Sequence, residues 1–372
     1  MNRSLALHDS WQNKPSMVGL SFATSYSSWA VETPETQAMS SGPPIPQECK
    51  VLEAPLGAKL NEIDNPPLVA SAKQTSAARR QIESALYPQK VTTVQPIKGG
   101  ISGAYVFRVT TEDVRVYCAK VVLSLAKIAF PAVMKSEHRN YAWAAEHSLA
   151  PAIAFSDPET GLLITDFYTN EMADWYDGGK EPRLSASLDV MRALHSAKPP
   201  VRDCHYSAEN GITSWEGKLC KLSPEKQQAP FARLADRIAR ACIVGLSKQV
   251  YDAVPCHGDF HQGNVIYNTG KAWLIDWGDL EVSDPMKEVA YFAYFVDANL
   301  DRLNPLLERY DRSLAQEDKN RATYHLALLQ ASRYLLTLRD MEWETKMWQG
   351  NRLPVLEQYL LEDANLLGLN EP

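Results

Sequence analysis

The stretch that decides the interpretation of this chain is residues 254–266, VPCHGDFHQGNVI, together with residues 272–279, AWLIDWGD. The first segment holds Asp259, and Asn264 follows it five residues later. The second segment places another acid, Asp276, twelve residues after Asn264 and directly behind the apolar run AWLI. A loop that leads into a short hairpin can bring the amide and both carboxylates to one point. The spacing therefore predicts one polar site built from two neighbouring segments.

These residue types match the chemistry of phosphoryl transfer from a nucleotide. One carboxylate accepts the proton of the attacking hydroxyl, and an amide oxygen and a second carboxylate hold Mg²⁺ against the phosphates. His257, Asp259 and His261 also alternate, so on a strand they would share a face and could bind the metal of a hydrolase. The hydrolase alternative gives no role to Asn264 or to any residue upstream, so the pattern favours phosphoryl transfer.

A glycine-rich turn and a lysine upstream support the same chemistry. Residues 98–105, KGGISGAY, form a turn between two strand-like runs, and glycines let backbone N–H groups approach phosphate oxygens. Lys120 lies in the following run, VYCAKVV, on the face that it would share with Cys118. A charge there needs a partner or a phosphate to offset its desolvation, and Glu137 in the next predicted helix is the candidate partner. The alternative is a solvated lysine near a sheet edge.

The order of predicted elements gives two lobes of unequal composition. Residues 1–75 hold serine- and proline-rich pieces without a sustained period, which is typical of a loose N-terminal extension. Residues 76–168 predict a small β-rich lobe with an antiparallel meander, and residues 169–372 predict a larger, mainly helical lobe, an α+β fold overall. Helices are expected at 76–86, 136–148, 187–195, 231–250, 287–299, 320–343 and 353–367, and strands at 91–98, 105–111, 114–123 and 162–167.

Composition excludes several classes of protein. The 372 residues include 38 Lys and Arg against 45 Asp and Glu, a net charge of −7, which argues against a nucleic-acid-binding protein. The longest apolar run, at 289–296, is far shorter than the roughly 20 residues that a membrane helix needs. The six cysteines form no C-x-x-C pair, and the N-terminus shows no secretory signal. We therefore expect a cytoplasmic protein without a membrane span, and leave its oligomeric state open.

The segment HGDFHQGNVIY…WLIDWGD resembles the aminoglycoside phosphotransferase and choline kinase superfamily, whose fold is protein-kinase-like. The resemblance covers residue 76 to the C-terminus and extends to MRALHS at 191–196 and SDP at 283–285. It implies an ATP- and Mg²⁺-dependent kinase that phosphorylates a hydroxyl of a small molecule. Two alternatives are a protein kinase, against which the missing activation segment argues, and a non-catalytic pseudokinase, against which the intact polar residues argue.

The resemblance also implies roles for individual residues. Asp259 is similar to the catalytic base, and His261 stands where protein kinases carry Lys, so we place both among the catalytic residues. Asn264 and Asp276 are similar to the Mg²⁺ ligands, although Gly278 replaces the Glu of many members. The nucleotide site would comprise the phosphate-covering turn, the lysine with its glutamate, and the hinge beside the adenine at 163–167: Gly99, Gly100, Ser102, Gly103, Lys120, Glu137 and Asp166.

The acceptor is expected between the catalytic loop and the C-terminal helices. Acidic residues such as Asp279, Asp284 and Glu288 are frequent there, and further acids alternate with Trp343 and Trp348. Carboxylates beside aromatic faces suit a cationic amine through Coulomb attraction and cation–π contact. We therefore predict Asp279, Trp343 and Trp348 as acceptor-site residues and a choline-like amino alcohol or an aminosugar as acceptor. The alternative is a neutral sugar or another hydroxylated metabolite, with the aromatic residues packed in the core.

Overall fold

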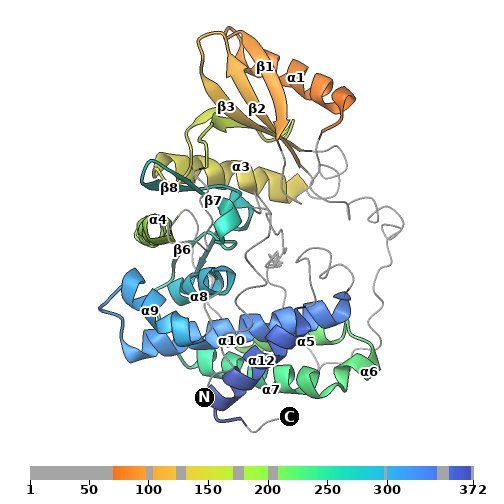
Figure 1. Cartoon of the computed structure of the whole chain (residues 1–372), viewed down its shortest axis with the longest axis vertical. Helices are drawn as coiled ribbons and strands as arrows, with labels where there is room; N and C mark the ends of the chain where they lie inside the picture. Colours follow the sequence, from red (N-terminus) through yellow and green to blue (C-terminus); the bar gives the residue numbers. More distant parts are fainter. Residues whose placement is uncertain are drawn as a thin grey trace, which may run out of the picture.

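The computed structural model describes residues 70–97, 104–122, 131–170, 180–199, 208–296, 300–341 and 352–369. They form two lobes, with a β-sheet at one end of the molecule and a group of helices at the other (Figure 1). The expected two-lobed α+β architecture is therefore confirmed. The predicted N-terminal extension lies outside the described residues as far as position 69.

Five antiparallel strands make the sheet of the N-terminal lobe, in the order β1-β2-β3-β5-β4. Their bounds are Val91–Ile97 for β1, Ala104–Thr111 for β2, Val116–Val122 for β3, Ile153–Asp157 for β4 and Leu162–Asp166 for β5. Four of these strands match the prediction, and β4 is an addition. It is a sheet edge of five residues with no fully buried position, so its apolar pattern is too weak to stand out.

Helix α1, Ala72–Leu86, packs on this sheet (Figure 1). It begins four residues before the predicted start because Ser71 and Gln74 form a capping box. Ser71 Oγ accepts from the backbone N–H of Gln74, and Gln74 Oε1 accepts from the backbone N–H of Ser71. Ile82 of this helix packs with Phe107 of β2, and both are fully buried.

Strand β3 points alternate residues to opposite faces of the sheet. Ala119 and Val121 pack in the core with α1, so Cys118 and Lys120 lie on the other face, toward helix α3 (Pro131–Glu146). Strands β2 and β5 pair with β3 on its two sides, which makes β3 an interior strand. The alternative of a solvated lysine near a sheet edge is therefore wrong.

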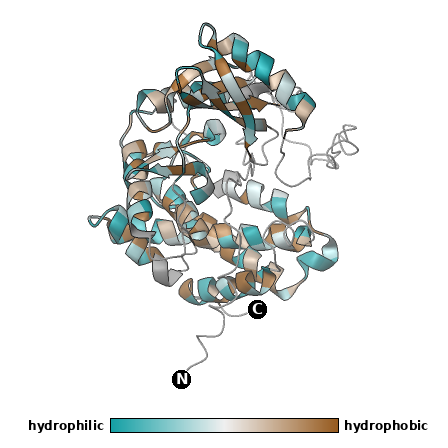
Figure 2. Ribbon diagram, turned by 45° about the horizontal axis from the view of Figure 1, so that its top comes forward, coloured by the Kyte–Doolittle hydropathy of each residue, from teal (hydrophilic) through white to brown (hydrophobic). Residues whose placement is uncertain are grey.

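The described helices of the C-terminal lobe are α4 (Lys180–His195), α5 (Ala208–Leu219), α6 (Pro224–Gln227), α7 (Pro230–Ser247), α8 (Pro285–Phe295), α9 (Leu300–Tyr310), α10 (Gln316–Arg339) and α12 (Leu353–Leu366). Helix α10 packs against α7, α8 and α12, and their apolar side chains share one core. Many helices carry hydrophilic and hydrophobic residues on the same ribbon, as expected for helices packed on one side (Figure 2). Among the helices that the structure describes, none is long and apolar enough to cross a bilayer.

Helices α5, α6 and α9 are additions to the predicted set. Helix α9 contains Pro305, and a proline inside a helical pattern normally ends or kinks the helix. Its buried residues nevertheless follow helical spacing: Leu303, Leu306, Leu307 and Tyr310. The pattern was therefore present in the sequence, but the proline obscured it.

Two short antiparallel pairs hold the segment that decided the interpretation of the sequence. Strand β6 (Val254–Cys256) pairs with β9 (Glu281–Ser283), and β7 (Val265–Asn268) pairs with β8 (Lys271–Leu274). The loop between β6 and β7 and the loop between β8 and β9 are thereby brought to the same place. The expected arrangement of a loop leading into a short hairpin is confirmed.

Candidate active site

The loop between β6 and β7 begins with a buried histidine that is committed to the backbone. His257 Nε2 donates to the carbonyl oxygen of Ile275 at 3.0 Å, and Nδ1 accepts from the backbone N–H of Asp259 at 3.3 Å. Burial lowers the pKa of His257, which is consistent with this neutral tautomer. Because both ring nitrogens are engaged, His257 has no atom left for a metal, and the alternating-ligand arrangement of the hydrolase alternative is not formed.

Gly258 is required by the close approach of the two loops. Its φ is +83°, and a Cβ at this position would lie 2.1 Å from the carbonyl oxygen of Asp279. Its backbone N–H donates to Glu288 Oε1 at 3.1 Å. No side chain fits between these two loops, so the glycine permits the contact that brings Asp279 to the loop between β6 and β7.

We expect Gly258→Ala to destabilise the fold and displace this loop. The added Cβ would clash with Asp279, and alanine disfavours the positive φ of this position. The clash alone should lower the free energy of unfolding by about 1–3 kcal/mol. Urea unfolding measures the loss. Gly270→Ala is the matched control, because Gly270 has a φ of +81° but nothing within 4 Å of an added Cβ. Equal losses in the two variants would contradict the close approach at Gly258.

Asp259 is buried, with 4% of its surface exposed, and both of its carboxylate oxygens are engaged. Tyr291 Oη donates to Oδ1 at 2.6 Å. Asn264 Nδ2 donates to Oδ2 at 3.1 Å and to the backbone oxygen of Asp259 at 2.9 Å. His261 Nδ1 accepts from the Gly263 N–H at 2.9 Å, so its proton is on Nε2, 3.5 Å from Asp259 Oδ2. The structure therefore brings Asp259, His261 and Asn264 together as predicted.

Asn264 presents its side-chain oxygen to the site. Because its Nδ2 donates to two oxygens of Asp259, the orientation of the amide is fixed. Its Oδ1 is buried and has no hydrogen-bond partner among the described residues. The backbone oxygen of Asn264 accepts from the Ile275 N–H at 3.0 Å, which ties the residue before Asp276 to this loop. A buried acceptor oxygen beside a carboxylate is a donor set that suits a hard cation such as Mg²⁺.

Asp276 adopts a left-handed backbone conformation, with φ 66° and ψ 66°. Such a conformation is uncommon for a residue other than glycine, although aspartate tolerates it better than most, and strained residues of this kind cluster at functional sites. Its carboxylate receives the side chain of Lys120, whose Nζ lies 3.0 Å from Asp276 Oδ1 and 2.5 Å from Glu137 Oε1. The predicted pair of Lys120 and Glu137 is thus formed, and Asp276 joins it from the other lobe.

The lysine and its two carboxylates shift the pKa values of one another. Burial alone would lower the pKa of Lys120, but the charges of Asp276 and Glu137 outweigh it and raise that pKa well above the ordinary value. Burial raises the pKa of Glu137, although the Lys120 ammonium opposes the shift. Lys120 is therefore a permanent positive charge at the junction of the two lobes.

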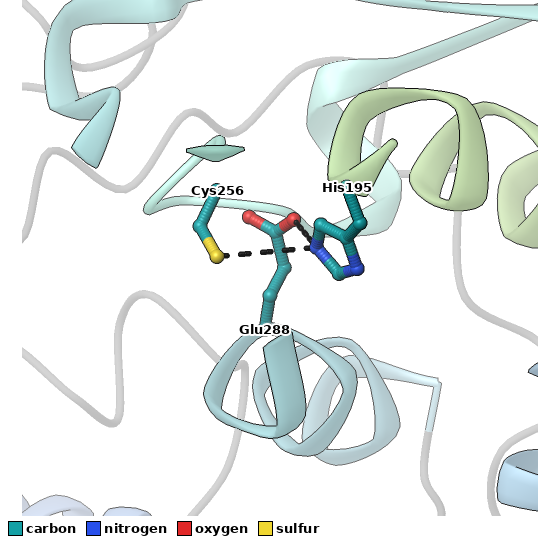
Figure 3. A group of neighbouring side chains, drawn as sticks. All are labelled: His195, Cys256 and Glu288. Carbon is teal, nitrogen blue, oxygen red and sulfur yellow. Dashed lines mark hydrogen bonds and ion pairs between the residues drawn. The ribbon is translucent and has the colours of Figure 1, made fainter. Parts of the chain in front are cut away.

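His195, Cys256 and Glu288 form a buried cluster next to the loop between β6 and β7 (Figure 3), and Tyr310 joins it through His195. His195 Nε2 lies 2.8 Å from Glu288 Oε2, and His195 Nδ1 lies 2.7 Å from Tyr310 Oη. Burial and the nearby Glu288 carboxylate raise the pKa of the Cys256 thiol well above its ordinary value. Each group is already satisfied by a neighbour, so this cluster is a hydrogen-bonded support. Glu288 links it to the N–H of Gly258.

Asp284 stabilises helix α8 and does not face the acceptor, although its place in the sequence suggested that it would lie near the acceptor. It caps α8, with Oδ1 accepting from the Met286 N–H at 2.9 Å. Its Oδ2 lies 3.0 Å from both Arg321 Nε and His325 Nε2 of α10. Like Glu288, Asp284 is buried and paired within the protein, which leaves Asp279 as the half-buried acid of this group.

The remaining predicted site residues fall into two groups. Asp279 is half-buried, and burial together with the charges of Asp259 and Asp276 raises its pKa to about 7. Asp166 ends β5 and is half-buried, at the hinge expected beside the adenine. The others lie outside the described residues: Gly99, Gly100, Ser102, Gly103, Trp343 and Trp348.

Sequence reasoning gave no role to Tyr291, and it placed Glu288 on the acceptor side. Both lie on α8, three residues apart, and they contact consecutive residues of the catalytic loop, Asp259 and Gly258. The i, i+3 spacing places both side chains on one face of α8, but the helix also carries Lys287 and Tyr294, so the spacing alone did not single out this pair. The sequence could not show that this face of α8 would pack against the loop between β6 and β7.

Comparisons with known proteins agree with this arrangement. Residues 93–325 match the model of the phosphotransferase enzyme family, APH. A choline/ethanolamine kinase family protein from Mesorhizobium loti has a similar structure, with a TM-score of 0.56 and 16% identity over 79% of this chain and 94% of that chain. Choline kinase LicA from Streptococcus pneumoniae gives a TM-score of 0.55 and 17% identity over 79% of this chain and 99% of that chain.

A third similar structure is the streptomycin–ATP–APH(2")-IIa ternary complex, with a TM-score of 0.51 and 13% identity over 77% of this chain and 99% of that chain. A search of the curated proteins finds none that matches this sequence. The similar structures show the fold, and the family match spans Lys120, Asp259, Asn264 and Asp276. The resemblance stated from the sequence is confirmed: the chain belongs to the APH phosphotransferase enzyme family and is a small-molecule phosphotransferase.

Proposed function

We propose that this enzyme transfers the γ-phosphate of ATP to a hydroxyl of a small cationic amine in a Mg²⁺-dependent reaction. The observation that carries the proposal is the environment of Asp259. Its buried carboxylate is oriented by Asn264 and Tyr291, in a loop tied to the loop that holds Asp276 and, through it, Lys120. A fixed base next to a fixed positive charge suits proton acceptance from a hydroxyl beside bound phosphates.

The nucleotide phosphates would lie at Lys120. Its Nζ is held between Glu137 and Asp276, so the position of the charge is set before a nucleotide binds. The adenine would lie beside the hinge that includes Asp166, with the glycine-rich turn over the phosphates. Beyond the hinge, Tyr168 stacks on Trp273 with ring centroids 4.2 Å apart, which fixes this segment against β8.

Asn264 and Asp276 are the proposed metal ligands. The unpartnered Oδ1 of Asn264 and the carboxylate of Asp276 are oxygen donors, which Mg²⁺ prefers. When bound, the ion would offset the negative charge that the phosphates carry during transfer. The left-handed backbone of Asp276 turns its carboxylate toward Lys120, so one side chain can serve both groups.

In the proposed chemical step, Asp259 accepts the proton of the acceptor hydroxyl. The acceptor oxygen forms a bond to the γ-phosphorus, the bond from that phosphorus to the bridging oxygen breaks, and ADP leaves with the electron pair. The hydroxyl proton passes to the Asp259 carboxylate. His261 places its Nε2 at 3.5 Å from Asp259 Oδ2, which is longer than a normal hydrogen bond, so Asn264 and Tyr291 are the residues that hold the carboxylate.

A cationic amine is the acceptor that the charges favour. Burial, together with the charges of Asp259 and Asp276, raises the pKa of Asp279 to about 7, so these three carboxylates lie close to one another. Aromatic rings adjoin the base, because Tyr291 contacts Asp259 and packs on Phe295 with centroids 4.9 Å apart. Negative potential beside aromatic faces attracts an ammonium group. Two of the similar structures are a choline kinase and a choline/ethanolamine kinase family protein, which supports this class.

A neutral hydroxylated acceptor is the second candidate, and one observation favours it. Arg333 Cζ lies 5.6 Å from the centroid of Phe295, the ring on which Tyr291 packs. The protein therefore already supplies a cation to this aromatic ring, and that charge opposes a second cation there. A sugar or similar acceptor would not experience this repulsion.

The test is ADP release from Mg·ATP with a panel of acceptors: choline, ethanolamine, an aminoglycoside, thiamine, homoserine and glucose. We expect release with an amine-bearing acceptor and none with glucose. Release with glucose alone would favour the second candidate. Retained ATP binding without release on any acceptor would contradict small-molecule transfer within these classes and point to a protein target or a binding-only function.

A further inference from the structure

Tyr291 makes the shortest contact to the carboxylate of the proposed base. Its Oη donates to Asp259 Oδ1 at 2.6 Å, compared with 3.1 Å for Asn264 Nδ2 and 3.5 Å for His261 Nε2, both at Oδ2. A hydrogen bond to an ionised group is shorter and about twice as strong as one between neutral groups. Tyr291 is therefore a principal constraint on the orientation of Asp259.

The hydrogen bonds to the Asp259 carboxylate leave lone pairs open for the acceptor hydroxyl. A carboxylate offers about four lone-pair sites on its two oxygens. Asn264 Nδ2 donates to Oδ2, and His261 Nε2 lies 3.5 Å from Oδ2, which is longer than a normal hydrogen bond. Among the described residues, Tyr291 is the donor at Oδ1. One lone pair of Oδ1 therefore stays open, and an incoming hydroxyl can donate its proton there while Tyr291 remains in place.

The placement of Tyr291 is fixed by the helix that carries it. Glu288, three residues earlier on α8, accepts from the Gly258 N–H at 3.1 Å and is itself paired with His195 at 2.8 Å. Two residues on one face of α8 thus hold two consecutive residues of the catalytic loop (Figure 3 shows Glu288 rising from this helix toward His195). The hydroxyl of Tyr291 approaches Asp259 from a rigid element, as accurate positioning requires.

We propose that Tyr291 is a positioning residue for phosphoryl transfer: its hydroxyl fixes the Asp259 carboxylate and directs the acceptor hydroxyl to the remaining lone pair of Oδ1. The inference rests on the proposed function. Tyr291 keeps its own proton throughout, and the proton of the acceptor moves to Oδ1 as the acceptor oxygen bonds to the γ-phosphorus and ADP leaves. Tyr291 acts through Asp259, so its loss should affect turnover and not nucleotide binding.

The experiment compares Tyr291→Phe with Tyr294→Phe. Both substitutions remove one hydroxyl from α8, and both rings pack on Phe295, at 4.9 Å for Tyr291 and 5.3 Å for Tyr294. ADP release from Mg·ATP is measured with water as acceptor and with the acceptor panel. We expect Tyr291→Phe to lower kcat by about 10- to 100-fold with an unchanged KM for ATP, the loss that one hydrogen bond to a charged group causes. Tyr294→Phe should change neither parameter.

A double-mutant cycle separates positioning from a structural effect. If Tyr291 acts through Asp259, Tyr291→Phe should cause no further loss of kcat in the Asp259→Asn background. A further loss in that background, wild-type kcat in Tyr291→Phe, or a raised KM at constant kcat would each overturn the inference. If Asp259→Asn also kept full turnover, or the wild type released no ADP, the proposed function would fail with it.

Discussion

Asp259→Asn is expected to reduce phosphate transfer by about 10²- to 10⁴-fold, the contribution of a positioned general base. The amide cannot take up the proton of the acceptor. It can still satisfy its neighbours, because its oxygen can accept from Asn264 Nδ2 while its NH₂ donates to Tyr291 Oη. The fold and the affinity for Mg·ATP should therefore be retained, which calorimetry and thermal unfolding measure.

The matched control for this substitution is Asp252→Asn, which makes the same chemical change at an exposed residue before β6. It should keep wild-type transfer and stability. Wild-type transfer in Asp259→Asn would show that another group accepts the proton. A collapse of ATP binding in that variant would show that the carboxylate belongs to the nucleotide site.

Asp276→Asn should remove most of the dependence of ATP binding on Mg²⁺. Asparagine tolerates the left-handed backbone found here, so the loop should keep its shape while the ligand loses its charge. Removing a group that merely orients a metal ligand costs about 10- to 100-fold in metal affinity or activity, and loss of a charged ligand should cost at least as much. Calorimetric titration of ATP with and without Mg²⁺ measures the change.

Asp259→Asn serves as the comparison in the same titration, because it alters a neighbouring carboxylate that is not a proposed metal ligand. It should keep the Mg²⁺ dependence of the wild type. If Asp276→Asn also kept that dependence, the metal assignment would be wrong, and the contact of Asp276 with Lys120 would be its remaining function.

The polar residues of the site were predictable because their chemistry is encoded locally. Asp259 and Asn264 lie in one tight loop, and the hairpin that follows delivers Asp276 to the same place. Lys120 was identifiable because a lysine on the buried face of a strand needs a partner, and the structure supplies Glu137 and Asp276. The two-lobed fold followed from the change in hydrophobic period along the chain.

The support next to the loop was not predictable, because it depends on how distant helices dock. His195 of α4, Glu288 of α8 and Tyr310 of α9 meet only in the folded lobe. No local period distinguishes Glu288, which is buried and paired, from the half-buried acids Asp279 and Glu281 near it in sequence. Tyr291 was not predictable for the same reason. It matters because it hydrogen-bonds Asp259, and that contact depends on how α8 docks.

The central claim is that this site forms a phosphate ester on a small hydroxylated molecule. Phosphorus-31 NMR of the wild type with Mg·ATP and the pooled acceptors tests it most directly, because it identifies where the phosphate goes. We predict a new phosphomonoester resonance that grows in step with ADP and is lost in Asp259→Asn. Conversion of ATP to ADP and inorganic phosphate alone, or no loss of ATP in the presence of every acceptor, would contradict the claim.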